Sequence, residues 1–105
     1  MKEEFELEAH EFEKNFYDFI DKKIVLYGTG RMTATLLTYL KGFHIIGVCD
    51  RNTDMIGRTV YGLPVLTRKE VEEQADLLII NTAETYWDVI YNRIEQWNIP
   101  IFFTN

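Results

Sequence analysis

The sequence has little cysteine and histidine, and it lacks an excess of positive charge. Its one cysteine, Cys49, excludes an internal disulfide framework and multi-cysteine metal sites, and its two histidines lie far apart at positions 10 and 44. We therefore expect no bound metal. The 11 lysines and arginines stand against 17 aspartates and glutamates, which gives a formal net charge of −6. Because a nucleic-acid binder needs a basic face that releases counterions, this charge argues against nucleic acid as a partner.

Long apolar runs are also missing. None approaches the roughly 18 residues of a membrane span, and residues 1–8 are acidic, unlike the basic and then apolar leader of a secreted protein. A cytoplasmic location is therefore expected. With 105 residues, 47% of them hydrophobic, the chain suits one compact domain.

Residues 1–22 predict an amphipathic N-terminal helix. An apolar stripe recurs there at steps of four and three residues between acidic positions, and it consists of Phe5, Ala9, Phe12, Phe16 and Phe19. Two interpretations remain open for this phenylalanine-rich stripe. It packs against the body of the domain, or it docks on a partner domain or on a second copy of the chain in a homodimer.

From residue 23 onward, short apolar segments alternate with helical periodicity. Strands are expected over residues 24–27, 44–49, 77–80 and 99–104, and helices over residues 31–41 and 84–97. A short helix through residue 74 follows Thr67, which forms a capping-box pattern with Glu70. Residues 60–66 suggest a turn and a short extended piece. This order predicts an α/β fold over residues 23–105, a Rossmann-like three-layer domain with a short parallel sheet and right-handed crossovers.

The chain stops directly after its last apolar strand, where a doubly wound enzyme usually continues. Two interpretations remain open. The sequence is a fragment of a larger protein, or it is a minimal domain whose last strand is covered by the N-terminal helix or by dimerisation.

The first strand leads into a glycine turn that opens a helix. The turn reads G-x-G-x-x-T over residues 28–33, with two of the three glycines of the dinucleotide fingerprint in the required strand, turn and helix context. Gly28 allows the tight turn, and Gly30 lets a ligand phosphate approach the main chain. Thr33 stands where the third glycine usually allows close packing of helix and strand. The residues predicted to bind a cofactor here are Gly28, Thr29, Gly30, Arg31 and Met32.

Asp50 ends the second strand 22 residues after Gly28, where an acid accepts hydrogen bonds from both hydroxyls of an adenosine ribose. Such an acid favours NAD over NADP, whereas the neighbouring Arg51 reverses that preference if it reaches a 2′-phosphate. Asp50 also suits the start of a turn, and the two roles can coexist.

By topology, Asn81, Thr82 and Ala83 follow the third strand and should line the same crevice as the glycine turn. The alternative is that Thr82 or Thr85 merely caps the last helix.

No catalytic set accompanies these residues. The sequence shows no Ser-His-Asp or Cys-His arrangement, no pair of carboxylates in a catalytic setting and no Walker lysine. Cys49 lies within an apolar strand and is expected to be a buried structural thiol. Trp87 and Trp97, at helical spacing, are expected in the core. No reaction can be assigned to the chain on these grounds.

The segment over residues 23–66 resembles the N-terminal Rossmann-like nucleotide-binding domain of bacterial sugar-modifying proteins. The similarity is to PglD-like sugar acyltransferases and to nucleoside-diphosphate-sugar epimerases and dehydratases of polysaccharide biosynthesis. The shared pattern is G-x-G after a strand, G-x-x-D at the end of the next strand, a later glycine, and a G-x-P-V turn. Here it comprises Gly28, Gly30, Gly47, Asp50, Gly57, Gly62, Pro64 and Val65.

This resemblance implies a nucleotide ligand, either NAD or NADP or the nucleotide part of a UDP-sugar. It also implies that Gly28 to Arg31 meet phosphates, Asp50 a ribose, and Thr82 or Ala83 the adjacent wall. The catalytic groups of these families lie in other domains. The leading hypothesis is a nucleotide-binding domain of a sugar or cell-envelope enzyme, and the alternative is an interaction or dimerisation module that has lost the ligand.

Overall fold

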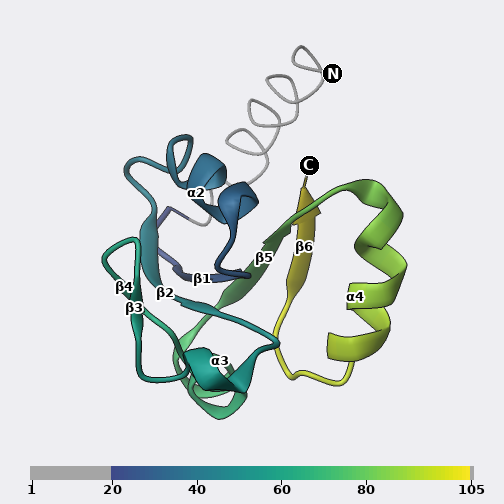
Figure 1. Cartoon of the computed structure of the whole chain (residues 1–105). Helices are drawn as coiled ribbons and strands as arrows, with labels where there is room; N and C mark the ends of the chain where they lie inside the picture. The colour runs from purple at the N-terminus through teal and green to yellow at the C-terminus, as the bar shows by residue number, and fades with distance from the viewer. Residues whose placement is uncertain (1–19, 105) are drawn as a thin grey trace.

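Four parallel strands form the centre of the structure, a computed structural model that describes residues 20–104 (Figure 1). The strands are β1 (Lys23–Tyr27), β2 (His44–Cys49), β5 (Leu77–Asn81) and β6 (Ile101–Thr104), in the order β2-β1-β5-β6. Every pairing between neighbours is parallel. The expected N-terminal helix falls almost entirely on residues outside the described part and stays a prediction.

Helices cover both faces of this sheet and make three layers. Helix α2 (Arg31–Leu37) packs on one face, while α3 (Arg68–Gln74) and α4 (Trp87–Ile94) pack on the other, so that α2 and α4 lie on opposite sides of the sheet in Figure 1. Successive strand residues point to opposite faces. Leu26 therefore shares a cluster with Leu36 of α2, and Val25 shares one with Val71 of α3 and Ile94 of α4.

The two central strands are apolar throughout because both of their faces are covered. All five residues of β5 are buried, as are Ile24, Val25 and Leu26 of β1. Such continuous burial is typical of parallel sheets between helical layers. The predicted Rossmann-like three-layer α/β fold is confirmed.

A small hairpin lies between β2 and α3. Its strands β3 (Thr59–Val60) and β4 (Leu63–Pro64) are joined by Tyr61 and Gly62, which both have positive φ angles, of 53° and 76°. Two such residues make the tight turn whose twist matches that of the flanking strands. The predicted turn and extended piece over residues 60–66 is therefore a hairpin.

Helix α3 begins as the sequence predicts. The Thr67 side chain accepts a hydrogen bond from the Glu70 amide, and the Glu70 carboxylate accepts one from the Thr67 amide at 3.0 Å. This capping box satisfies two amides that the first turn of a helix leaves without partners.

Helix α2 is shorter than predicted. It ends at Leu37 rather than at residue 41, because the following amides bond three residues back instead of four, including Tyr39 to Leu36 at 2.9 Å. This tighter turn still buries Leu40, and Gly42, with φ of 91°, then reverses the chain into β2. Met32, which helical spacing alone would place beside the buried Leu36 and Leu40, is 39% exposed.

The predicted last helix over residues 84–97 is also interrupted. A 3-10 turn, η3 (Glu84–Tyr86), precedes α4, which ends at Ile94. No side chain caps either element, so the alternative that Thr82 or Thr85 caps the last helix is wrong. The Thr82 carbonyl instead accepts a hydrogen bond from the Trp87 indole at 2.9 Å. Strand β6 begins after Pro100, which has no amide to donate.

Candidate functional site

The order in which the chain adds strands reverses between β1 and β5. The chain leaves β1 toward β2 on one side, whereas it leaves β5 toward β6 on the other. In open α/β sheets, ligands bind at such a switch point, outside the carboxyl ends of the strands. A crevice of about 240 Å³ lies there.

Most of the residues predicted to bind a cofactor line this crevice. They come from the turn after β1, the first turn of α2 and the end of β5, and they are Gly28, Gly30, Arg31, Met32, Asn81 and Thr82. The predicted Ala83 does not line it and instead precedes η3. Four further lining residues were not predicted from the sequence, namely Tyr27, Thr33, Ile80 and Ile90.

Hydrogen bonds from the core fix the conformation of the glycine turn at Gly28. Gly28 has φ of 103°, a conformation that side chains disfavour, and its amide bonds the Cys49 carbonyl at 2.6 Å. The hydroxyl of Thr33 donates to the Gly28 carbonyl at 2.9 Å, and this threonine is buried. Thr33 therefore replaces the close packing of a third glycine with a hydrogen bond between helix and turn.

The space next to the Cα atom of Gly30 is open. Its φ is −90°, which other residues adopt, and a Cβ atom added there would meet no atom of residues 20–104 within 4 Å. The described part of the fold therefore gives no reason for a glycine at this position. Helix α2 begins directly after Gly30 without a side-chain cap and without an acid in its first turn. This arrangement leaves main-chain amides and open space at the crevice for an anionic group.

Asp50 holds the glycine turn from β2. Its Oδ2 accepts hydrogen bonds from the Thr29 amide at 3.0 Å and from the Thr29 hydroxyl at 2.8 Å. Its Oδ1 accepts one from the Asn52 amide at 2.8 Å, which forms the predicted turn. A carboxylate offers about four acceptor sites, so about one remains for a ligand hydroxyl. Asp50 thus lies beside the glycine turn, and its predicted role as a ribose-binding acid stays a prediction.

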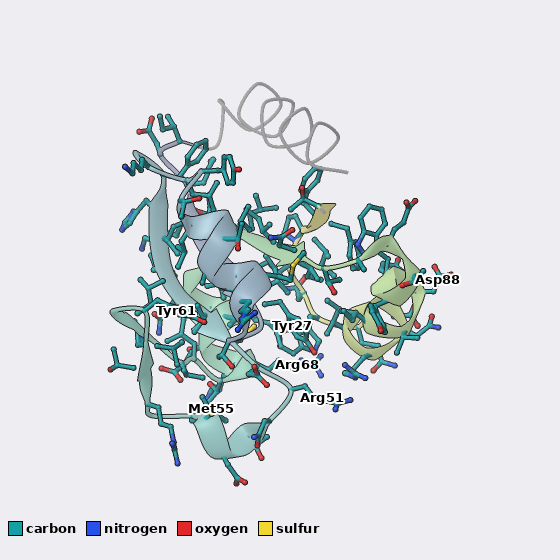
Figure 2. All side chains as sticks on the ribbon, turned by 45° about the horizontal axis from the view of Figure 1, so that its top comes forward. Tyr27, Arg51, Met55, Tyr61, Arg68 and Asp88 are labelled. Carbon is teal, nitrogen blue, oxygen red and sulfur yellow. The ribbon has the colours of Figure 1, made fainter. Side chains whose placement is uncertain are left out.

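Tyr61 reaches the same turn from the tip of the β3–β4 hairpin (Figure 2). Its hydroxyl lies 3.0 Å from the Thr29 carbonyl and 3.1 Å from the Gly30 carbonyl and donates its proton to them. In a trans peptide the carbonyl and the amide point in opposite directions, and the described residues contain no cis peptide. The amides of Gly30 and Arg31 therefore point away from Tyr61. Only the Tyr-Gly pair at a two-residue turn marks Tyr61 in the sequence.

Asn81, at the end of β5, lines the crevice and has an acceptor atom without a partner in the described part of the chain. Its Nδ2 donates to the Met32 carbonyl at 2.6 Å, which joins β5 to α2. The residue is only 4% exposed, and its buried Oδ1 has no hydrogen-bond partner among residues 20–104. A buried acceptor left without a partner costs about 1–3 kcal/mol, so a donor group of a ligand would stabilise this site.

A second pocket, of about 210 Å³, adjoins the crevice, and Tyr27 lines both. It contains the predicted Asp50 and Arg51 together with Arg68 of α3 and Arg93 of α4. Nothing in the local sequence around Arg68 and Arg93 marks them, because α3 and α4 meet β2 only in the folded chain.

The walls of this pocket are aromatic and apolar. Trp97, which was expected in the core, packs partly buried against the core cluster of this face and also forms the pocket wall, with the Arg68 guanidinium 5.7 Å from its ring centroid and the Tyr27 ring at 6.4 Å. Cys49 lines the pocket and is buried, as predicted. Burial and the nearby Asp50 carboxylate raise the pKa of the Cys49 thiol to about 12, so it stays protonated at neutral pH.

Neither a metal cluster nor a membrane-spanning helix is present among residues 20–104. No three acidic, histidine or cysteine side chains gather there to hold a metal ion. The helices of this part are too short and too polar to cross a bilayer.

Comparisons with known proteins identify the fold and a family model. The model described as C2185-like, N-terminal, matches residues 20–101. Among solved structures, RSP, a Rex-family repressor, matches with a TM-score of 0.55 at 18% identity, over 91% of this chain and 53% of that one. RSP in complex with β-NADH matches with a TM-score of 0.53 at 13% identity, over 91% and 61%. No curated protein matches the sequence.

These likenesses support a Rossmann-like fold. The chain spans between half and two thirds of the length of the RSP chains, so the activity of RSP as a repressor is not carried over. Neither RSP structure is a sugar-modifying enzyme. The predicted link to PglD-like acyltransferases, to epimerases and to polysaccharide biosynthesis therefore stays a prediction.

Proposed function

This chain belongs to the C2185-like, N-terminal family, and we propose that it is a nucleotide-binding domain that holds NAD or NADP across the carboxyl edge of its sheet. The observation that carries the proposal is the crevice at the switch point. There Gly30, which leaves open space, and Asn81, whose Oδ1 has no hydrogen-bond partner among residues 20–104, line the same space. The proposal is also supported because one solved structure of similar fold is a complex with β-NADH.

Each wall has a role in this proposal. The main chain from Gly28 to Arg31 binds the phosphates, because Gly30 lets them approach and the Tyr61 hydroxyl turns two amides away from itself. Asp50 accepts from one ribose hydroxyl. Asn81 Oδ1 accepts from a donor group of the ligand's other half, which fixes how that half lies in the crevice.

Each pocket alone is too small for a whole dinucleotide. Pockets for drug-sized ligands measure roughly 300 Å³ or more, whereas these two measure about 240 and 210 Å³. Since Tyr27 lines both, a dinucleotide occupies them together, with one half on either side of the end of β1. A nucleotide-sugar fits the same arrangement, and the titration below includes it.

No catalytic set is assigned to this domain. The proposal is that it supplies the binding half of a larger enzyme, in which a further domain carries the reacting groups. Sugar or cell-envelope metabolism is the setting that the sequence resemblance favours.

The test is calorimetric and thermal titration of the full chain with NAD, NADH, NADP, NADPH and a UDP-sugar. A ligand at 100 times its dissociation constant adds about 2.7 kcal/mol, which raises the melting temperature by roughly ten degrees or more. The variant Gly30→Val fills the open space and should abolish the shift. Thr35→Val, on the exposed side of α2, is the control and should keep it. Flat curves with every ligand would contradict the proposal.

The interaction module is a second candidate, because α4 and the preceding turn expose large apolar side chains. Tyr86, Val89 and Tyr91 are each about half exposed. If the chain is an interaction module, it should form a dimer. Replacing Phe12 and Phe16 with polar residues should weaken that dimer. Light scattering that finds a monomer at every concentration would exclude it.

A further inference from the structure

Positive charge gathers at the second pocket of an otherwise acidic chain. The chain carries a net charge of −6, yet three of its five arginines line this pocket, namely Arg51, Arg68 and Arg93. Arg31 lines the crevice, which leaves Arg58 as the one arginine outside both. Among residues 20–104, Asp50 is the one acid that lines the second pocket. This balance favours an anionic ligand there.

The three arginines come from three separate elements. Arg51 follows β2, Arg68 begins α3 and Arg93 lies in the last turn of α4. Figure 2 shows Arg51, Arg68 and Tyr27 close to one another. Such convergence depends on the tertiary fold and not on a basic run in the sequence.

Two of these guanidinium groups lack an acidic partner among the described residues. Arg68 forms an ion pair with Glu72 at 2.7 Å and also donates to the Gln96 carbonyl at 3.1 Å. By contrast, the nearest hydrogen-bond partner of Arg93 is the Tyr27 hydroxyl at 3.5 Å. Arg51 has no hydrogen bond or ion pair within residues 20–104. Arg51 and Arg93 are therefore available to a phosphate, while Arg68 is held in place.

The remaining walls suit a planar base. Tyr27 and Trp97 supply aromatic surface, and Cys49, Leu66 and Ile94 form a buried apolar floor. A volume of about 210 Å³ fits a nucleoside rather than a whole dinucleotide. Because Asp50 lies between this pocket and the glycine turn, the ribose that joins the base to the phosphates would lie beside it.

The hydrogen bonds of Asp50 disfavour an unmodified ribose at this place. Recognition of both hydroxyls needs two acceptor sites, but Thr29 and Asn52 already occupy three of about four. A ribose with one free hydroxyl and a phosphate on the other oxygen needs only one acceptor site, and Asp50 has about one left. The negative charge of Asp50 repels that phosphate, but three guanidinium groups surround the same pocket.

We propose that the second pocket holds the 2′-phosphoadenosine end of the ligand, with Arg51 and Arg93 on the 2′-phosphate, and that the chain prefers NADP(H) to NAD(H). This rests on the proposed function for the choice of dinucleotide. It goes beyond that function by naming the phosphorylated form and the residues that select it.

The test compares NADPH, NADH and the fragment 2′-AMP on the full chain by calorimetry. NADPH should bind at least about tenfold more tightly than NADH, which is the fold-change that one charge-assisted hydrogen bond carries. Arg51→Gln and Arg93→Gln should each reduce this preference severalfold and leave NADH affinity nearly unchanged. Arg58→Gln is the matched control and should keep the preference.

The fragment separates this inference from the proposed function. 2′-AMP should bind more tightly than 5′-AMP, and Gly30→Val should spare its binding, because the fragment does not reach the glycine turn. Binding of NADH as tight as that of NADPH would overturn the inference and leave the proposed function standing. Binding of 2′-AMP with no binding of either dinucleotide would overturn the proposed function and leave an adenosine phosphate site. Absence of binding by all of these ligands would overturn both.

Discussion

The carboxylate of Asp50 holds Thr29 by both of its donors, the hydroxyl at 2.8 Å and the amide at 3.0 Å from the same oxygen. Residues 21 positions apart thereby tie the end of β2 to the turn after β1. Since Gly30 and Arg31 follow directly, this contact sets the shape of the turn that would meet a phosphate.

Thr29→Val should lower stability and weaken ligand binding together. It removes one hydrogen bond to a charged group in a partly buried setting, which contributes about 1–2 kcal/mol. Urea denaturation measures the first effect, and titration with NADPH measures the second. Thr35→Val, at an exposed position of α2, is the control. A Thr29→Val chain as stable as the control would show that the contact carries no stability.

Tyr61→Phe should weaken ligand binding more than it lowers stability. The hydroxyl holds the carbonyls of Thr29 and Gly30, while the ring sits on an exposed hairpin tip with positive φ. Loss of this hydrogen bond should weaken the binding free energy by about 1 kcal/mol, which raises the dissociation constant roughly fivefold. Tyr86→Phe, at a tyrosine that is 59% exposed, is the control. Equal affinity in both variants would remove Tyr61 from the site.

Thr33→Gly should destabilise the chain, although it restores the third glycine of the dinucleotide fingerprint. It breaks the hydrogen bond to the Gly28 carbonyl and places a glycine inside α2, at a combined cost of about 2 kcal/mol. Thr33→Ser keeps the hydroxyl and should lose less. If Thr33→Gly raised the melting temperature, the Thr33 hydrogen bond would not stabilise the chain, and the threonine would only be a tolerated substitute for the third glycine.

The Cys49 thiol should make stability fall at alkaline pH. Its pKa rises from the ordinary 9.0 to about 12 on folding, so the unfolded chain loses this proton first. Its contribution is therefore full below about pH 9 and declines between pH 9 and 12, by about 1.4 kcal/mol per pH unit. Urea titrations of the wild-type chain and Cys49→Ser over this range measure it. An equally steep decline in Cys49→Ser would assign the effect to other groups.

The strands of the sheet and the main parts of the crevice could be predicted because their signals are local. The apolar runs at β1, β2 and β5, the glycines of the turn and the capping box at Thr67 all depend on short spacings. Strand order then brings Asn81 and Thr82 to the glycine turn, since the carboxyl ends of parallel strands share one edge.

Other features could not be predicted because tertiary contacts decide them. Tyr61 and Thr29 lie 32 positions apart, and the Arg93 and Tyr27 side chains lie 66 apart. Helical spacing alone would place Met32 in the core beside Leu36, whereas the side chain is 39% exposed at the crevice. Trp97 fits a helix stripe by spacing, but α4 ends at Ile94 and leaves it at the arginine pocket.

The most direct test of the central claim is an NMR titration of the ¹⁵N-labelled full chain with NADPH. The largest amide shifts should fall on Gly28, Gly30 and Arg31, with further shifts at Asp50 and Thr82. The amides of Lys69 and Glu73, on the exposed side of α3, should stay unchanged. A spectrum that does not change at millimolar NADPH, or one whose largest shifts fall on Lys69 and Glu73 instead of the glycine turn, would contradict this claim.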